Sequence, residues 1–245
     1  MGAKRVRKER FLKLHPFCCF CGGESPSSTI DHVPNRASFP QRVGPEGFEF
    51  PACDGCQRAT RLDELAFSIM VRFCRNEGDY DQAQFLRLLD GIKNNMPELL
   101  PDLSLTASDK RRGLRKLGLL KPASLDLSEL PLAGIPAGYQ PRIVRYIRKI
   151  VLALYYRHLS KVAPKTRKVW TMWSTGQGTN MNEAIRTWSE MTPIIDVGKR
   201  QNIDIGNQFR ARLNYNEELD AFVTIGQFSA GLIFYGSCLT DEIAD

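Results

Sequence analysis

The stretch that decides the fold runs from Cys18 to Thr60 and contains Cys18-Cys-Phe-Cys21, Thr29-Ile-Asp31-His32-Val-Pro34 and Cys53-Asp-Gly-Cys56-Gln57. Two Cys-x-x-Cys pairs therefore bracket a single Asp-His dipeptide. Four thiolates at this spacing suit one tetrahedral zinc ion, because soft sulfur ligands close structural zinc sites. A pair of disulfides is the weaker alternative, since nothing in the sequence suggests secretion. We expect one structural zinc ion, bound by Cys18, Cys21, Cys53 and Cys56.

The arrangement resembles the zinc-stapled branch of the HNH, or His-Me finger, endonucleases of bacteria. In that family an Asp-His pair ends a first strand, and a second strand leads into a helix whose first turn carries a metal ligand. Cys-x-x-Cys pairs flank this ββα-metal core, and an Asn usually follows the last cysteine. The resemblance covers residues 15–75 and matches Asp31, His32, Pro34 and the four cysteines, with Gln57 in place of the Asn.

The resemblance implies a hydrolase that cleaves the phosphodiester bonds of DNA. His32 would be the general base, and a side chain whose ordinary pKa is about 6.5 suits that role. Asp31 and Gln57 would hold one catalytic Mg²⁺ or Mn²⁺ ion, which neutralises charge on the phosphate. Arg58 or Arg61 would clamp a neighbouring phosphate. The loop at 35–47, which carries Arg36 and Arg42, is expected to lie across a groove of the nucleic acid.

Asp31 and His32 can reach the same phosphate only under one condition. Adjacent residues of a strand point to opposite faces, so the strand has to end at this dipeptide. Pro34 favours an end there, because proline fits poorly in a continuing strand. The alternative is a strand-end Asp-His pair that only hydrogen-bonds to the local backbone.

Composition sets bounds on the rest of the chain. With 245 residues, 42% hydrophobic and 25% charged, the chain suits one large globular domain or two smaller ones. No apolar run reaches the roughly 18 residues that a membrane span needs, and no signal-peptide core is visible. We therefore expect a cytoplasmic protein with reduced thiols and no membrane partner.

Positive charge is concentrated in the middle of the sequence. Residues 110–168 contain 15 basic and 2 acidic side chains, against a net charge of +7 for the whole chain. Such a block is typical of a surface that contacts a phosphate backbone. Within it, residues 141–159 indicate a helix with an apolar stripe and a DNA-binding basic face that includes Arg142, Arg145 and Lys149. The alternatives are a solvated helix face and a docking site for an acidic protein partner or activating subunit.

The periodicity of apolar residues predicts an α+β fold. Short strands are expected at 28–30 and 48–50, followed by a helix from Leu62 whose first turn contains Asp63 and Glu64. Further helices are expected at 81–95, 109–117, 141–159 and 183–191, and further strands at 169–174, 207–215, 221–226 and 231–235. We expect an HNH nuclease domain with the zinc site at 1–75 and a helical, proline-rich connecting segment at 76–138. An accessory α+β domain, a helix plus an antiparallel sheet, is expected at 139–245.

Two classes of function follow from these features. The first is a metal-dependent HNH endonuclease acting on DNA, for which an effector of bacterial anti-phage defence is one biological role. The second is a catalytically inert, zinc-folded module that binds nucleic acid or docks on a partner protein. RNA is an alternative substrate for the nuclease, because a ββα site grips the backbone rather than the base edges. Neither class fixes an oligomeric state.

Overall fold

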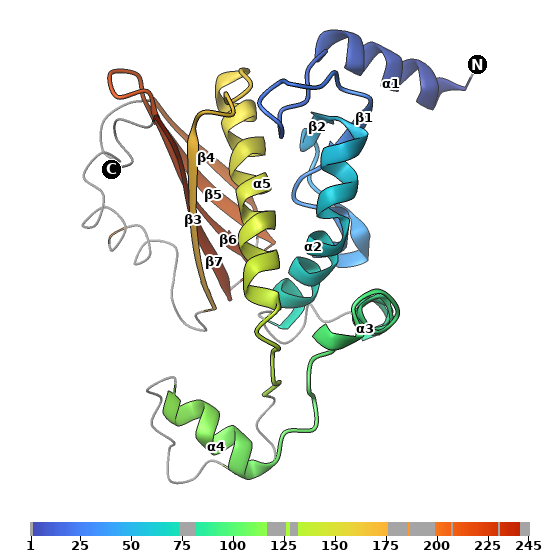
Figure 1. The fold of residues 1–245 in the computed structure, drawn as a ribbon, viewed down its shortest axis with the longest axis vertical. Coiled ribbons are helices and arrows are strands. Elements are labelled where there is room, and N and C mark those ends of the chain that lie inside the picture. The colour runs from blue at the N-terminus through green and yellow to red at the C-terminus, as the bar shows by residue number, and fades with distance from the viewer. Residues whose placement is uncertain are drawn as a thin grey trace.

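The computed structural model describes residues 2–73, 82–116, 126–127, 132–175, 186, 199–206, 208–229 and 231–240. Over these ranges the chain forms five α-helices and two antiparallel sheets, which confirms the prediction of an α+β fold (Figure 1).

The stretch that carries the paired cysteines folds into two short strands and a long helix. Strand β1 (Thr29–His32) pairs antiparallel with β2 (Glu49–Ala52), and helix α2 (Asp54–Phe73) follows. Both strands begin within one residue of their predicted positions and each extends two residues further. The helix begins well before the expected Leu62, because its first two turns are polar and show no apolar stripe. Asp63 and Glu64 therefore lie in the middle of α2, and the prediction that they occupy its first turn is wrong.

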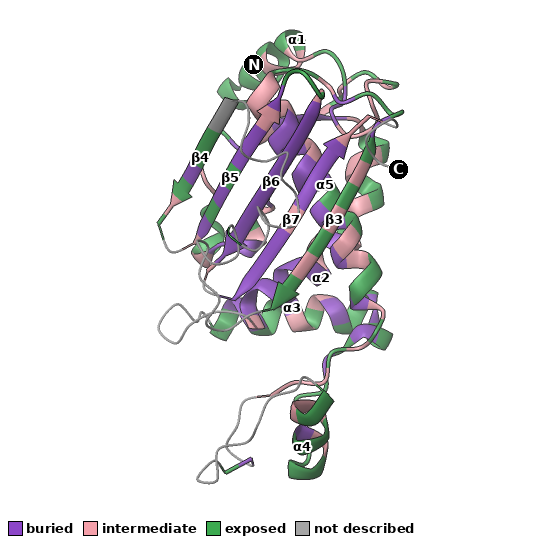
Figure 2. Ribbon diagram, turned by 90° about the vertical axis from the view of Figure 1, so that its left-hand side faces the viewer, coloured by how far each residue is buried: buried purple, intermediate pink, exposed green. Residues whose placement is uncertain are grey.

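The remaining helices contribute unequally to the core. They are α1 (Ala3–Leu14), α3 (Gln82–Asn95), α4 (Ala107–Lys116) and α5 (Tyr139–Leu159), with short 3-10 turns at Arg36–Ser38, Pro40–Arg42 and Pro97–Leu99. The predictions for α3, α4 and α5 are confirmed to within a few residues at each end. Helix α1 buries none of its residues, and α4 projects away from the rest of the molecule (Figures 1 and 2). Helices α2, α3 and α5 therefore supply most of the helical part of the core.

The second half of the chain forms a five-stranded antiparallel sheet. Its order is β3-β7-β6-β5-β4, from β3 (Lys168–Thr175), β4 (Lys199–Ile205), β5 (Phe209–Asn216), β6 (Ala221–Phe228) and β7 (Leu232–Leu239). Four of these strands confirm predictions made from apolar runs. The edge strand β4 is not predicted, because its residues are mostly polar, as an edge position allows. The helix expected at 183–191 lies outside the described residues, apart from Arg186.

Helix α5 lies between the large sheet and the unit formed by β1, β2 and α2, as Figure 1 shows. Its apolar stripe is buried as predicted, and Phe67 of α2 packs on Tyr146 of α5 with 4.8 Å between ring centroids. Phe228 of β6 contacts the same Phe67 at 5.1 Å and Phe39, from the loop after β1, at 6.2 Å. Residues of the expected segments 1–75 and 139–245 thus share one hydrophobic core.

The helix and the sheet approach each other closely at Gly236 of β7. A Cβ atom at this position would lie 2.1 Å from Cγ2 of Val151 on α5, so a larger residue would push the helix away. Strand β6, beside β7, is buried along its whole length (Figure 2). This packing fixes the position of α5, and with it the charged side chains that α5 sends toward α2 and β1.

Candidate functional site

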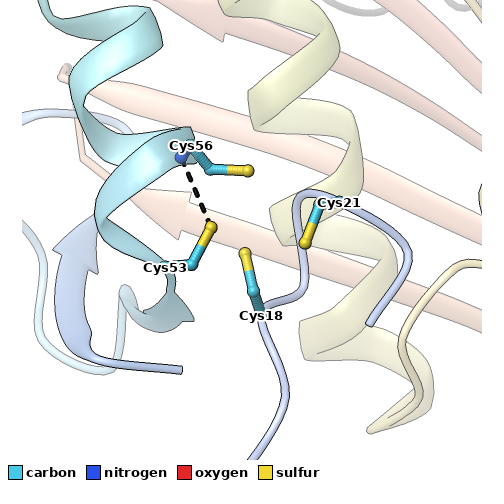
Figure 3. Close-up of side chains that lie close together, drawn as sticks. All are labelled: Cys18, Cys21, Cys53 and Cys56. Carbon is cyan, nitrogen blue, oxygen red and sulfur yellow. Dashed lines mark hydrogen bonds between the residues drawn. The ribbon is translucent and has the colours of Figure 1, made fainter. Parts of the chain in front are cut away.

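Four cysteines form a cluster that could hold a metal ion. Cys18 and Cys21 lie on the turn before β1, Cys53 directly precedes α2, and Cys56 is in its first turn. The four Sγ atoms lie within 4.8 Å of one another, and Figure 3 shows them directed toward a common centre. In a tetrahedral zinc site with Zn–S bonds of about 2.3 Å, the sulfur atoms are about 3.8 Å apart. The donor set and its spacing therefore fit the expected structural zinc ion.

Local backbone geometry prepares these thiols for a metal. The backbone N–H of Cys56 donates to Sγ of Cys53 at 3.4 Å, and the N–H of Phe20 donates to Sγ of Cys18 at 3.4 Å. Burial opposes ionisation of Cys53, but hydrogen bonds from Cys56 outweigh it and lower the pKa of Cys53 to about 7. Gly22 has a φ of +70°, a conformation that glycine adopts without strain, and so lets the chain turn directly after Cys21.

Two further candidate ligands beside this cluster are used elsewhere. Cys19 is 1% exposed and packs in the hydrophobic core, where burial raises the pKa of its thiol. Nδ1 of His15 lies 2.7 Å from the hydroxyl of Tyr156 on α5. Among the described residues, Cys18, Cys21, Cys53 and Cys56 are the one group of three or more His, Cys, Asp or Glu side chains close enough to share an ion.

Asp31 points into the protein, where it meets a buried lysine. Nζ of Lys149 lies 2.7 Å from Oδ2 of Asp31 and 2.7 Å from Oε1 of Glu64, and it donates to Oγ1 of Thr60 at 2.6 Å. The side chains of Lys149 and Asp31 are 3% and 7% exposed. Burial alone would lower the pKa of Lys149, but the two carboxylates more than compensate and raise it. We call this group of Lys149, Asp31, Glu64 and Thr60 the lysine cluster.

His32 points to the opposite face of β1 and is partly open to solvent. Its side chain is 31% exposed, and its Nε2 lies 2.7 Å from Nη2 of Arg36 and 3.3 Å from Oε1 of Glu49, the residue opposite it on β2. Oε2 of Glu49 in turn accepts from Arg7 of α1 at 2.7 Å. Burial, followed by the positive charge of Arg36, lowers the pKa of His32, although Glu49 opposes the shift. We call this group of His32, Arg36, Glu49 and Arg7 the histidine cluster.

The expected catalytic Mg²⁺ or Mn²⁺ at Asp31 and Gln57 does not fit this geometry. Asp31 and His32 follow the alternation of an ordinary strand and do not converge on one point. Oδ2 of Asp31 already faces the ammonium of Lys149, whose charge repels a second cation at the same oxygen. Mg²⁺ also keeps several of its waters, which a carboxylate 6% exposed leaves little room for. Gln57, half-buried in the first turn of α2, therefore lacks Asp31 as its partner ligand for such an ion.

The arginines expected at the nucleic acid fall into two groups. Arg36, Arg58 and Arg61 are exposed, as contact with a substrate requires. Arg142 and Arg145 of α5 instead bind Asp63 of α2, which is 2% exposed. Arg145 donates from Nε and Nη2 to the two carboxylate oxygens at 2.9 and 2.8 Å, and Arg142 donates at 3.2 Å. These two side chains therefore tie α5 to α2.

The prediction that Lys149 lies on an exposed basic face is wrong, because the lysine cluster buries its side chain.

Sequence reasoning also missed the parts played by Thr60, Glu64 and Glu49. One signal was present: Lys149 is followed directly by the buried Ile150 and Val151 in the apolar stripe of α5. A lysine among such residues indicates a buried carboxylate partner, because an unpaired buried ammonium is costly.

No protein-family model, curated protein or solved structure matches this chain. Over the described part of the chain, no helix is both long enough and apolar enough to cross a bilayer. The chemistry of the site is therefore argued from its own residues.

Proposed function

We propose that this protein is a zinc-stapled nuclease that hydrolyses phosphodiester bonds of DNA, with His32 as the general base. The observation that carries the proposal is the histidine cluster. His32 is accessible, its pKa is lowered so that the imidazole is neutral at pH 7, and a guanidinium able to bind phosphate touches its Nε2. A neutral imidazole beside a phosphate-binding group is the arrangement that general-base hydrolysis requires.

Arg36 gives the cluster a resting state and a substrate-bound state. Because a guanidinium only donates, Nε2 of His32 accepts its hydrogen bond in the free protein. A bound phosphate diester carries a full negative charge, so it attracts the guanidinium more strongly than a neutral imidazole does. The movement of Arg36 to the phosphate would then free the lone pair of Nε2.

The reaction follows from that second state. A water oxygen attacks phosphorus while Nε2 takes one of its protons, and the bond from phosphorus to the departing oxygen breaks. The departing oxygen receives a proton from solvent. Arg36 stabilises the charge that develops on the phosphate, and Glu49, 3.3 Å from Nε2, stabilises the imidazolium that forms. No step is assigned to Asp31. A zinc ion held by Cys18, Cys21, Cys53 and Cys56 would fix the cysteine-bearing turn against α2.

Binding of nucleic acid without hydrolysis is a second candidate, and the lysine cluster favours it. Lys149 occupies the oxygen of Asp31 at which a catalytic cation is expected in the family that the sequence resembles. In this alternative His32 and the exposed arginines only position the backbone. RNA is a substrate or ligand in either case if the site contacts phosphates alone.

Nicking of supercoiled plasmid by the zinc-loaded protein tests the proposal. Reactions with and without added Mg²⁺, with DNA and with RNA, would be compared for the wild type, His32→Ala and a matched control, His158→Ala. We expect His32→Ala to lower the rate by roughly 10²–10⁴ and leave DNA affinity nearly unchanged, because that is the usual contribution of a general base. The control should cleave like the wild type.

Two results would decide against hydrolysis by His32. If His32→Ala retains more than half of the activity, the base lies elsewhere. If the wild type binds DNA but cleaves neither substrate under any metal condition, the binding module is the better description.

A further inference from the structure

A cavity of about 280 Å³ lies between the loop after β1, helix α2 and helix α3. Its apolar part is formed by Ala37, Leu65 and Leu88, and its polar part includes three arginines, one from each element: Arg42, Arg61 and Arg87. None of its lining residues belongs to the zinc site, and His32 is absent from it. The cavity is therefore a separate feature from the proposed catalytic centre.

The described lining of this cavity carries more positive than negative charge. No carboxylate among the described residues pairs with Arg42, Arg61 or Arg87, whereas Arg142 and Arg145 both bind Asp63 of α2. The one carboxylate in the lining is that of Glu64, whose Oε1 is bound by Lys149 at 2.7 Å and by Thr60 at 3.2 Å. Three arginines thus line one hollow, and over the described residues the one carboxylate beside them, that of Glu64, is already held by Lys149.

The backbone that presents Arg42 is unusual. Gln41 and Arg42 have φ values of 51° and 59°, so two consecutive residues other than glycine adopt the left-handed region. Each such residue costs about 1 kcal/mol, and such conformations cluster at ligand-binding and active sites. Here the conformation accompanies a side chain that lines the cavity. It is a second observation that points to the same place.

We propose that this cavity binds a small phosphate-bearing ligand of the size of a mononucleotide. Guanidinium groups recognise phosphate by paired, charge-assisted hydrogen bonds, and three of them suit a dianionic phosphate monoester. The apolar side formed by Leu65 and Leu88 receives the organic part of the ligand. A volume of about 280 Å³ is just below the usual range of about 300–1,000 Å³ for ligand pockets and therefore suits a small ligand. The inference does not depend on hydrolysis by His32.

Calorimetric titration of the zinc-loaded full chain with adenosine monophosphate, inorganic phosphate and adenosine tests the site. We expect saturable binding of the monophosphate at one site, weaker binding of inorganic phosphate, and no measurable binding of adenosine. Arg42→Gln, Arg61→Gln and Arg87→Gln should each weaken the monophosphate by about tenfold, since one charge-assisted contact is lost.

Arg58→Gln is the matched control, because Arg58 is an exposed arginine of α2 that does not line the cavity. It should bind the monophosphate within about twofold of the wild type, a change too small to reflect a lost contact. Circular dichroism and zinc content should be unchanged in all four variants, so that a loss of binding reports on the site. The proposal is overturned if neither phosphate compound binds, or if Arg58→Gln weakens binding as much as the three others. It is also overturned if phosphate binding appears only with oligonucleotides, which would indicate a backbone-binding surface.

Discussion

The ammonium of Lys149 lies 2.7 Å from the carboxylate of Asp31, and both side chains are almost completely buried. One residue comes from α5 and the other from β1, so this ion pair joins the helix that supports the large sheet to the strand that carries His32. Glu64 adds a second carboxylate from α2. Charge complementarity, as well as apolar packing, therefore sets the position of β1.

Substitution of Lys149 by Met should be strongly destabilising. It removes the only ammonium described in the lysine cluster and leaves the buried carboxylate of Asp31 and the partly buried carboxylate of Glu64 without it. We expect the free energy of unfolding to fall by about 3–5 kcal/mol, the usual cost of removing one partner of a buried pair. Denaturant-induced unfolding measures it. The control is the neighbouring exposed Arg148→Met, which should change stability by less than about 0.5 kcal/mol. Equal losses for the two variants would mean that the ion pair is not formed in solution.

Replacement of Asp31 by Asn should separate a structural role from a catalytic one. An amide oxygen still accepts from Lys149, but the charge attraction is lost, so stability should fall by about 1–3 kcal/mol. The rate of plasmid nicking by the remaining folded protein should stay within about threefold of the wild type, because no step uses Asp31. A loss comparable to that of His32→Ala would show that Asp31 takes part in the chemistry.

The pKa of His32 should move in opposite directions when its two charged neighbours are removed. Arg36→Ala should raise the pKa, because it deletes a positive charge 2.7 Å from Nε2, and Glu49→Gln should lower it further. Proton NMR titration measures both, and with three histidines in the chain the signal is assigned by its absence in His32→Ala. The acidic limb of the pH–rate profile should shift in the same two directions. If both variants shifted the pKa of His32 in the same direction, Arg36 and Glu49 would not both lie beside His32 as the histidine cluster requires.

The lowered pKa also has a consequence for stability. Unfolded His32 binds its proton at a pH of about 6.5, whereas the folded side chain binds it only at lower pH. The unfolded state therefore takes up more protons in the window below pH 6.5, and stability rises with pH across that window. The contribution of neutral His32 is complete above about pH 6.5 and is lost as pH falls toward its folded pKa.

One zinc ion per chain should be found by elemental analysis of the purified protein. Cys53→Ser should lose the ion and become protease-sensitive, because assembly of a structural zinc site is coupled to folding. Cys19→Ala is the control, since Cys19 lies beside the site but packs in the core, and it should keep its zinc. If the purified protein is active and stable but contains no metal, the four cysteines are not a structural zinc site.

Replacement of Gly236 by Ala should lower stability through a single contact. The added methyl group would lie 2.1 Å from Cγ2 of Val151, so helix or strand has to shift, which typically costs about 1–3 kcal/mol. Adding Val151→Ala should recover part of that loss, although it leaves a small cavity on its own. A double-mutant cycle by chemical denaturation gives the interaction energy. Strictly additive effects would show that the two residues do not meet.

The four-cysteine cluster could be predicted because its information is local. Two Cys-x-x-Cys pairs specify their own ligand set, and their positions next to β1 and α2 follow from short strands with clear boundaries. Most helices and strands were also predictable from apolar periodicity. The partners of the basic residues were not, because charge along a sequence does not say which carboxylate a side chain will meet. Arg145 looks the same in the sequence whether it faces DNA or, as the fold places it, Asp63 of α2.

The opposite orientations of Asp31 and His32 were likewise only half predictable. The alternation of a strand requires them, and Pro34 suggested that the strand would end early enough to relax the rule. Strand β1 instead extends to His32 and pairs it with Glu49, so the alternation holds through the dipeptide. The length of the partner strand β2 could not be predicted, because the loop that precedes it has a mixed composition and does not mark where the strand begins.

The contact of Phe67 with Phe228 has a consequence for the order in which the chain folds during synthesis. The four-cysteine stretch and α2 leave the ribosome before their partners, because α2 can meet α5 only after residue 159 has been made and β6 only after residue 228. Contacts of such long sequence separation form slowly, because a long loop has to be closed before they are gained. A zinc ion bound early by the four cysteines would hold the first unit together. Until α5 and β6 are made, Ala66, Phe67, Ile69 and Met70 remain exposed. A nascent chain stalled within this interval presents that apolar face to chaperones or to other copies of itself.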